Sequence, residues 1–122
     1  MNREKLVKLI ETLIRTHSPC GNEKEIDGLL MAEFRKHCPR VWQDPAGNVI
    51  GLIPGPKKAK RGPMAIGTHK DEIGMIVKRV EEDGRVTLES TGGSQAWIYG
   101  EGAIDILGDK GIVTGVLSFG AR

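Results

Sequence analysis

The sequence has few aromatic residues, no long apolar run and no strong excess of either charge. Aromatic residues make up 4% of its 122 residues, so a core must be built mainly from Leu, Ile and Val. No apolar stretch approaches the roughly 20 residues that a transmembrane helix needs. The formal net charge of +2 is too small to indicate a nucleic-acid or membrane partner by itself. These absences favour a globular, water-soluble protein or a piece of one.

Cysteine is also scarce, since the chain holds Cys20 and Cys38 and nothing marks them as a disulfide framework. Free thiols are typical of a cytoplasmic protein. The charged residues 3–5 lead into an amphipathic pattern rather than into the apolar core of a signal peptide. We therefore expect a cytoplasmic location.

Apolar residues recur at helical spacing twice before residue 39, which predicts two amphipathic helices. The first covers residues 3–16 and carries a stripe of Leu6, Leu9, Ile10, Leu13 and Ile14. The second begins after Asn22, a good N-cap residue that can form a capping box with Glu25. Pro39 ends this helix at Cys38, because the residue before a proline avoids helical angles.

From residue 40 onwards the period changes from helix to strand. The predicted strands are 41–43, 49–53, 63–68, 73–80, 85–88, 103–107 and 111–117. Turn residues at 44–48 and at Asp83-Gly84 predict hairpins. The unbroken apolar segment 63–68 is typical of a strand buried on both faces of a sheet.

This order predicts an α/β chain made of two parts. Residues 1–73 would form part of a mixed sheet with helices packed on it, and residues 74–122 a separate small β-rich unit. Most of the 17 glycines follow Ala46, in keeping with a second half rich in strands and turns. One buried strand cannot make a sheet, so we expect the first part to need partners from further polypeptide.

The stretch from Gly67 to Glu72 directly follows the predicted buried strand, where functional groups gather in open α/β sheets. Neutral imidazole is a common zinc ligand, and a carboxylate on its other nitrogen fixes the ring. His69 is therefore a candidate metal ligand, with Asp71 as the acid that orients it. A catalytic zinc usually has three protein ligands, so other ligands must come from elsewhere. The alternative interpretation is an exposed, charged turn between two strands.

Two other clusters have alternative interpretations. His17, Cys20, His37 and Cys38 are metal-ligand types, but adjacent side chains on a helix diverge. A loop thiol at Cys20 and a packed thiol at Cys38 are the simpler expectation. The basic run 57–61 is a candidate nucleic-acid contact, yet no aromatic residue lies among its charges, so a solvated loop is expected.

Four stretches in chain order resemble the tetrahedral (TET-type) glutamyl and leucyl aminopeptidases, some of which are labelled endoglucanases. Residues 68–77 are similar to the His-x-Asp-Glu-Ile-Gly segment of that family, and residues 44–50 to its Asp-x-x-Gly-Asn hairpin. Residues 18–23 resemble the entry to its second helix, and residues 108–116 resemble a strand pair of its inserted β domain. Together the four stretches span nearly the whole chain.

The resemblance implies a metalloaminopeptidase: an α/β catalytic domain interrupted by a small β-barrel-like assembly domain. It implies two divalent metal ions, zinc or cobalt, with His69 as a ligand and Asp71 as its orienting partner. It further implies peptide substrates with a free N-terminus and large homo-oligomers. Residues 1–73 would then be the N-terminal part of the catalytic domain, and residues 74–122 the first part of the inserted domain. The composition itself indicates neither a nucleic-acid nor a membrane partner.

The sequence departs from the family at Lys70, where an apolar residue, often Met, is usual. It also stops at Arg122, before the positions of the family's other ligands and its general-base glutamate. We therefore expect this chain alone to be inactive and to need a completing chain or further polypeptide. The alternative function is a non-catalytic oligomerisation or interaction fragment.

Overall fold

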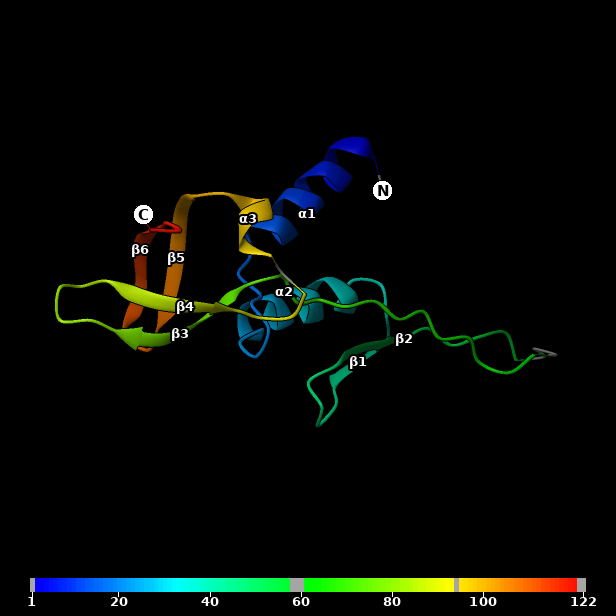
Figure 1. Cartoon of the computed structure of the whole chain (residues 1–122). Helices are drawn as coiled ribbons and strands as arrows, with labels where there is room; N and C mark the ends of the chain where they lie inside the picture. Colours follow the sequence, from blue (N-terminus) through cyan, green and yellow to red (C-terminus); the bar gives the residue numbers. More distant parts are fainter. Residues whose placement is uncertain (1, 58–60, 94, 121–122) are drawn as a thin grey trace. The chain divides into compact units, whose positions relative to one another are not determined.

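A computed structural model describes residues 2–57, 61–93 and 95–120, and the chain divides into two compact units, Met1–Met75 and Ile76–Arg122. The helices and strands are α1 (Arg3–Arg15), α2 (Lys24–Arg35), β1 (Arg40–Gln43), β2 (Val49–Leu52), β3 (Met75–Val80), β4 (Val86–Ser90), α3 (Ala96–Tyr99), β5 (Gly102–Gly108) and β6 (Gly111–Leu117) (Figure 1). No helix within the described ranges has both the length and the apolar composition to cross a membrane.

Helix α1 agrees with the predicted first helix to within one residue. The side chain of Asn2 caps it by accepting a hydrogen bond of 2.9 Å from the backbone N–H of Lys5. Glu4 in the first turn and Arg15 in the last turn have the signs that the helix dipole favours. Its apolar side chains nevertheless remain accessible, and Ile14 is 74% exposed.

Helix α2 forms as predicted, but its predicted N-cap is wrong. The helix begins at Lys24, with Glu23 at the N-cap position and no capping hydrogen bond from its side chain. A turn explains the difference, because Asn22 donates its backbone N–H to Pro19 over 2.9 Å and Gly21 has a φ of +89°. This turn delays the start of the helix.

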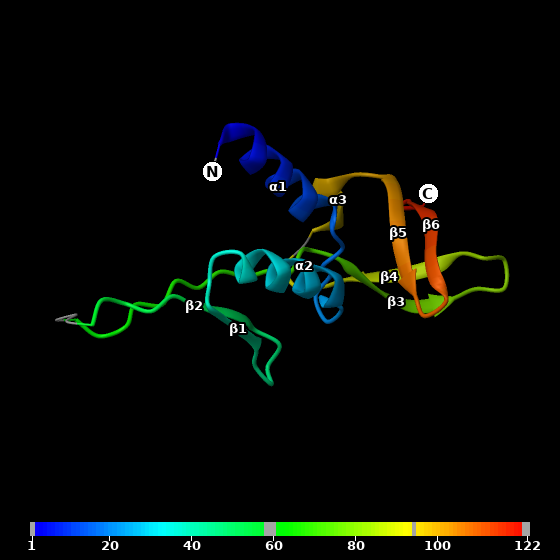
Figure 2. The same ribbon diagram turned by 180° about the vertical axis from the view of Figure 1, so that it is seen from behind.

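The predicted hairpin between residues 41 and 53 is confirmed. Strands β1 and β2 are antiparallel, with Arg40 opposite Leu52 and Gln43 opposite Val49. The hairpin lies beside α2 in both views of the chain (Figure 1 and Figure 2). Ile26 of α2, which is 4% exposed, is the buried apolar side chain of the described residues.

Gly51 allows β2 to approach the end of α2 closely. A Cβ atom at this position would lie 2.8 Å from Sγ of Cys38 and 2.9 Å from Cδ2 of Phe34. Real Cβ atoms do not approach neighbours so closely, so only glycine fits here without a shift of these side chains. This packing gives Cys38 the half-buried position expected from the sequence.

The predicted buried strand at 63–68 is wrong for this structure. Residues 63–68 belong to no strand, and the side chains of Met64 and Ile66 are 85% and 89% exposed. A strand forms only where a neighbour accepts and donates its backbone hydrogen bonds, and no strand of the described residues pairs with this segment. The expected mixed sheet is likewise replaced by three separate two-stranded sheets.

The second unit is built from hairpins. Strand β3 pairs with β4, and Gly84, with a φ of +84°, lies in the connecting turn where Asp83-Gly84 was expected. Strands β5 and β6 pair antiparallel over the register from Gly102↔Leu117 to Gly108↔Gly111. Between β4 and β5, where no strand was predicted, lies the short helix α3. A closed β-barrel-like domain is not formed by these described strands.

The carboxylate of Glu101 holds the open end of the β5–β6 hairpin. It accepts 2.8 Å hydrogen bonds from the backbone N–H of Phe119 and from the hydroxyl of Ser118. These two bonds lower the pKa of the Glu101 carboxyl below its ordinary value. The residues before β5 and after β6 are thereby tied together.

Replacing Gly51 by Ala tests the packing of β2 on α2. The added methyl group would overlap Phe34 and Cys38, so we expect the free energy of unfolding to fall by about 1–3 kcal/mol. Urea denaturation followed by circular dichroism measures this loss. Gly55→Ala is the matched control, because a Cβ there meets nothing within 4 Å. Equal stability of the two variants would contradict the packing described.

The hydrogen bonds of the Asp44 carboxylate lead us to expect that acid destabilises the β1–β2 turn. Hydrogen bonds from the side chain and the backbone of Asn48, and from the backbone of Ala46, hold the pKa of Asp44 below its ordinary value. A lowered pKa in the folded state means that this stabilisation is present above the unfolded pKa of about 3.9 and is lost as the pH falls through the folded pKa.

We therefore expect the Tm of the wild type to fall more steeply below about pH 4 than that of Asp44→Asn. Scanning calorimetry from neutral to acid pH provides the measurement. Asp109→Asn changes the same charge in the β5–β6 turn and serves as the control. Parallel pH profiles for the wild type and Asp44→Asn would show that these hydrogen bonds do not stabilise the turn.

Candidate functional site

The segment His69–Glu72 is held to the rest of the first unit through the side chains of Lys70 and Glu72. Lys70 pairs with Asp27 of α2 and donates a 2.7 Å hydrogen bond to the carbonyl oxygen of Gly47. Glu72 accepts a 2.9 Å hydrogen bond from the backbone N–H of Ser18. His69 and Asp71, which alternate with these two residues, contact each other instead.

The attachment at Glu72 is reinforced by the backbone. The N–H of Glu72 donates to the carbonyl oxygen of Ser18 over 2.8 Å, and Pro19 and Glu72 form an isolated parallel bridge. Ser18 is 5% exposed, which makes it the buried polar residue of the described chain. Its backbone N–H and C=O both bond to Glu72, so the loop after α1 fixes the position of the segment.

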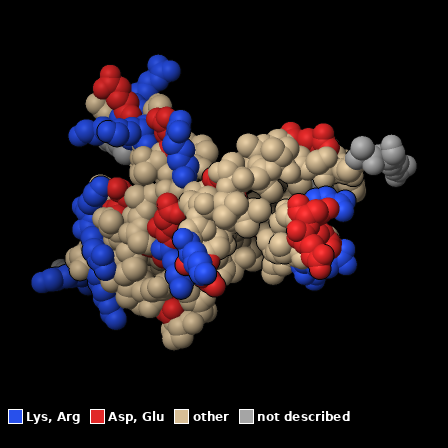
Figure 3. Space-filling model, turned by 90° about the vertical axis from the view of Figure 1, so that its left-hand side faces the viewer, with Lys and Arg blue, Asp and Glu red and all other residues tan. Residues whose placement is uncertain are grey.

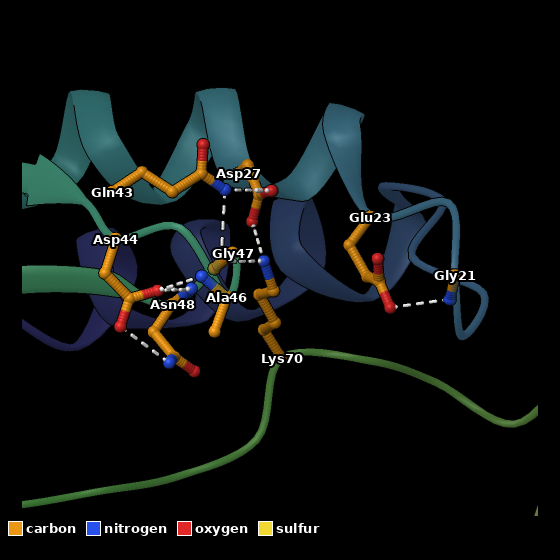
Figure 4. A network of polar contacts seen from close by, with 9 residues as sticks. All are labelled: Gly21, Glu23, Asp27, Gln43, Asp44, Ala46, Gly47, Asn48 and Lys70. Carbon is orange, nitrogen blue, oxygen red and sulfur yellow. Dashed lines mark hydrogen bonds and ion pairs between the residues drawn. The ribbon is translucent and has the colours of Figure 1, made fainter.

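The attachment at Lys70 is a four-residue polar network (Figure 4). Gln43 donates from Nε2 to the Asp27 carboxylate over 2.7 Å and to the carbonyl oxygen of Gly47 over 3.0 Å. Lys70 points from its own segment toward the same two acceptors. The side chains of Lys70 and Asp27 are 23% and 16% exposed, so solvent screens their attraction less than it screens a surface pair.

His69 and Asp71, predicted from sequence, lie together. Nδ1 of His69 is 3.0 Å from the backbone carbonyl oxygen of Asp71 and 3.4 Å from the nearer carboxylate oxygen. The nearer partner of the ring is thus the carbonyl group rather than the expected carboxylate. Because a carbonyl oxygen only accepts, Nδ1 carries the proton in the neutral ring and the lone pair is on Nε2.

This arrangement fits one metal ligand. The His69 side chain is 83% exposed and that of Asp71 43%, so a metal ion can reach Nε2 of His69. Among the described residues no group of three His, Cys, Asp or Glu side chains is placed to hold a metal ion. His69 and Asp71 can therefore supply one part of a metal site, and further ligands have to complete it.

The alternative cluster of His and Cys residues is not assembled in the described chain. His17 directs Nδ1 to the carboxylate of Glu25, 3.2 Å away, and Cys20 is an exposed free thiol. Cys38 packs against Gly51 instead. The expectation of a loop thiol and a packed thiol is met.

The structure describes only the two ends of the basic run 57–61. Lys57 and Arg61 are exposed, and residues 58–60 lie outside the described part of the chain. On the face drawn in Figure 3, Lys and Arg side chains lie among Asp and Glu side chains, and a large area carries neither kind. The solvated-loop interpretation stays a prediction.

The network partners of Lys70 were not predicted from the sequence. Asp27 is 43 residues away and lies on α2, where a charged residue is usually solvated. Lys70 itself carried the one usable signal, because a lysine at a position that is apolar in the resembled family needs an acid or a carbonyl group if it is to be buried.

Residues 47–122 match the model of the M42 glutamyl aminopeptidase family, and His69 and Asp71 lie inside this match. The curated "Putative aminopeptidase SgcX" of Escherichia coli (strain K12) is 29% identical over 106 residues, which is 87% of this chain and 28% of that protein. A "Putative aminopeptidase" of Acetivibrio thermocellus is 27% identical over 93 residues, 76% of this chain and 27% of that protein.

A third relative, from Pyrobaculum aerophilum and named a putative LysW-lysine/LysW-ornithine hydrolase, is 30% identical over 105 residues, 85% of this chain and 25% of that protein. The chain therefore spans under a third of the length of each of these relatives. No solved structure matches it significantly. Since the family model covers more than half of its residues, the chain belongs to the M42 glutamyl aminopeptidase family.

Proposed function

We propose that this chain is the N-terminal segment of a metal-dependent aminopeptidase that removes N-terminal residues from peptides. The observation that carries the proposal is the His69–Asp71 pair, presented on an anchored segment within the family match. The names of the two aminopeptidase relatives support hydrolysis of an N-terminal peptide bond.

In this proposal His69 holds one of two divalent ions, zinc or cobalt, through Nε2. The hydrogen bond from Nδ1 to the carbonyl group of Asp71 fixes the tautomer, and the adjacent carboxylate stabilises the proton on Nδ1. When bound, the metal ions supply Lewis acidity and make a water molecule nucleophilic at neutral pH. Lys70 and Glu72 hold the segment so that the imidazole keeps its direction.

The remaining ligands and the general base are proposed to come from polypeptide outside this sequence. The described residues offer one histidine with one nearby acid, whereas a catalytic metal site usually needs three protein ligands. The exposed apolar side chains of segment 63–68 are consistent with packing against further polypeptide. A cytoplasmic location, suggested by the free thiols, belongs to the same proposal.

The second unit is proposed to begin an inserted β domain that mediates homo-oligomer assembly. Apolar side chains of β6 support this, since Ile112, Val113 and Val116 are 56%, 63% and 79% exposed. If the chain has no catalytic partner, the same surface supports the alternative of a non-catalytic interaction fragment. Residues 74–122 are the predicted extent of this part.

Replacing His69 by Ala in the complete enzyme tests the metal assignment. We expect the loss of about one metal ion per protomer and a fall in kcat of at least about a hundredfold, because the missing ligand has no substitute. Elemental analysis and hydrolysis of aminoacyl-nitroanilides measure the two effects. His37→Ala, another exposed histidine of the first unit, is the control. Unchanged metal stoichiometry in His69→Ala would reject the assignment.

The isolated chain provides a second test. With one histidine and one acid at the site, purified residues 1–122 supplied with zinc or cobalt are expected to show no enzymatic cleavage of aminoacyl-nitroanilides. Size-exclusion chromatography with light scattering on the same sample separates the two functions. A folded, metal-free oligomer would favour the interaction fragment, and turnover by this chain alone would show that our ligand assignment is incomplete.

A further inference from the structure

We propose that Lys70 and Asp27 form a positioning pair that orients the metal-binding side of the 69–72 segment before any metal binds. This inference rests on the proposed function, because it concerns how His69 is presented to the metal. It adds a role for two residues that do not themselves bind the metal. The argument depends on where Lys70 is anchored, on the second anchor at Glu72 and on the local charge.

Lys70 is held from two separate elements of the first unit. Its Nζ contacts the carboxylate of Asp27 on α2 and the carbonyl oxygen of Gly47 in the β1–β2 turn (Figure 4). Gln43 bonds to both of these acceptors as well, so each acceptor is held from two directions. The position of Lys70 is thereby fixed against α2 and the hairpin together.

Two anchors restrict the segment more than one does. Lys70 and Glu72 are two residues apart, and each is tied to a different part of the first unit, Lys70 to Asp27 and Glu72 to Ser18. A segment held at one point can still rotate about its own axis, whereas two anchors prevent that rotation. His69 and Asp71, beside and between the anchors, are consequently held in place with the segment.

The charge of Lys70 needs Asp27 for a separate reason. An ammonium group one residue from a metal ligand would repel a divalent cation if it were unpaired, because like charges repel at short range. Asp27 is 16% exposed and contacts Nζ directly, so it neutralises this charge at the protein side of the segment. The pair therefore provides an anchor without adding net positive charge beside His69.

The test compares four variants of the complete enzyme by titrating zinc into metal-free protein in a calorimeter. Lys70→Met and Asp27→Asn are each expected to weaken zinc affinity about tenfold, as loss of an orienting partner does elsewhere. The double variant should bind no more weakly than the weaker single variant, because both changes break the same pair. Lys70→Arg keeps the charge and the donors and should bind within about twofold of the wild type.

Activity provides a second measurement that a general loss of structure would not reproduce. Excess zinc should restore the kcat of Lys70→Met, because the ligand is present but poorly directed. It should not restore the kcat of His69→Ala. Lys36→Met removes a lysine from another ion pair of the first unit, with Glu33, and should behave as the wild type.

Wild-type zinc affinity in Lys70→Met would overturn the proposal. An equal loss of zinc affinity in Lys36→Met, or in Lys70→Arg, would also overturn it. If Lys70→Met does not fold, the milder change Asp27→Asn decides by the same criterion. The proposed function fails separately, through unchanged metal binding in His69→Ala. Loss of metal in His69→Ala with normal binding in Lys70→Met and Asp27→Asn would remove only the positioning role.

Discussion

The ion pair between Lys70 and Asp27 joins the candidate metal ligand to the helix and hairpin of the first unit. The segment 61–71 belongs to no strand, and fixing its backbone costs conformational entropy that no sheet hydrogen bond offsets. At Lys70 a side chain holds this segment to the rest of the first unit. Directly after the segment, at Glu72, an isolated parallel bridge adds a backbone contact. The direction of the His69 ring depends on these two attachments.

Hydrogen bonds rather than apolar packing make these attachments because little apolar surface is buried nearby. Ile26 is the buried apolar residue among the described positions, whereas Met64 and Ile66, just before the site, are almost fully exposed. The long side chain of Lys70 reaches the Asp27 carboxylate and the carbonyl oxygen of Gly47 and bonds to both. These polar contacts, rather than apolar packing, hold the segment at this point.

Elements with local signals were predicted well from the sequence. The Leu and Ile spacing predicted α1, and Asp44 with Gly47 predicted the β1–β2 turn, because these patterns depend on residues a few positions apart. The early N-cap at Asn22 was wrong since a turn from Pro19 competes for the same backbone groups. The strand at 63–68 was wrong because its hydrogen-bond partners are not among the described residues, and an apolar run cannot supply them.

Only the local contact of the site, between residues close in the sequence, could be predicted. Residues 69 and 71 are two positions apart in the chain, so the sequence alone places them near each other. Which atom of Asp71 faces the ring does not follow from the sequence, since the backbone carbonyl at 3.0 Å and the carboxylate at 3.4 Å compete for the same proton on Nδ1. The side on which His69 lies is decided by Asp27, 43 residues from Lys70, and such a pairing carries no local sequence signal. In our proposal, the orientation of the candidate metal ligand is thus set by residues outside its motif.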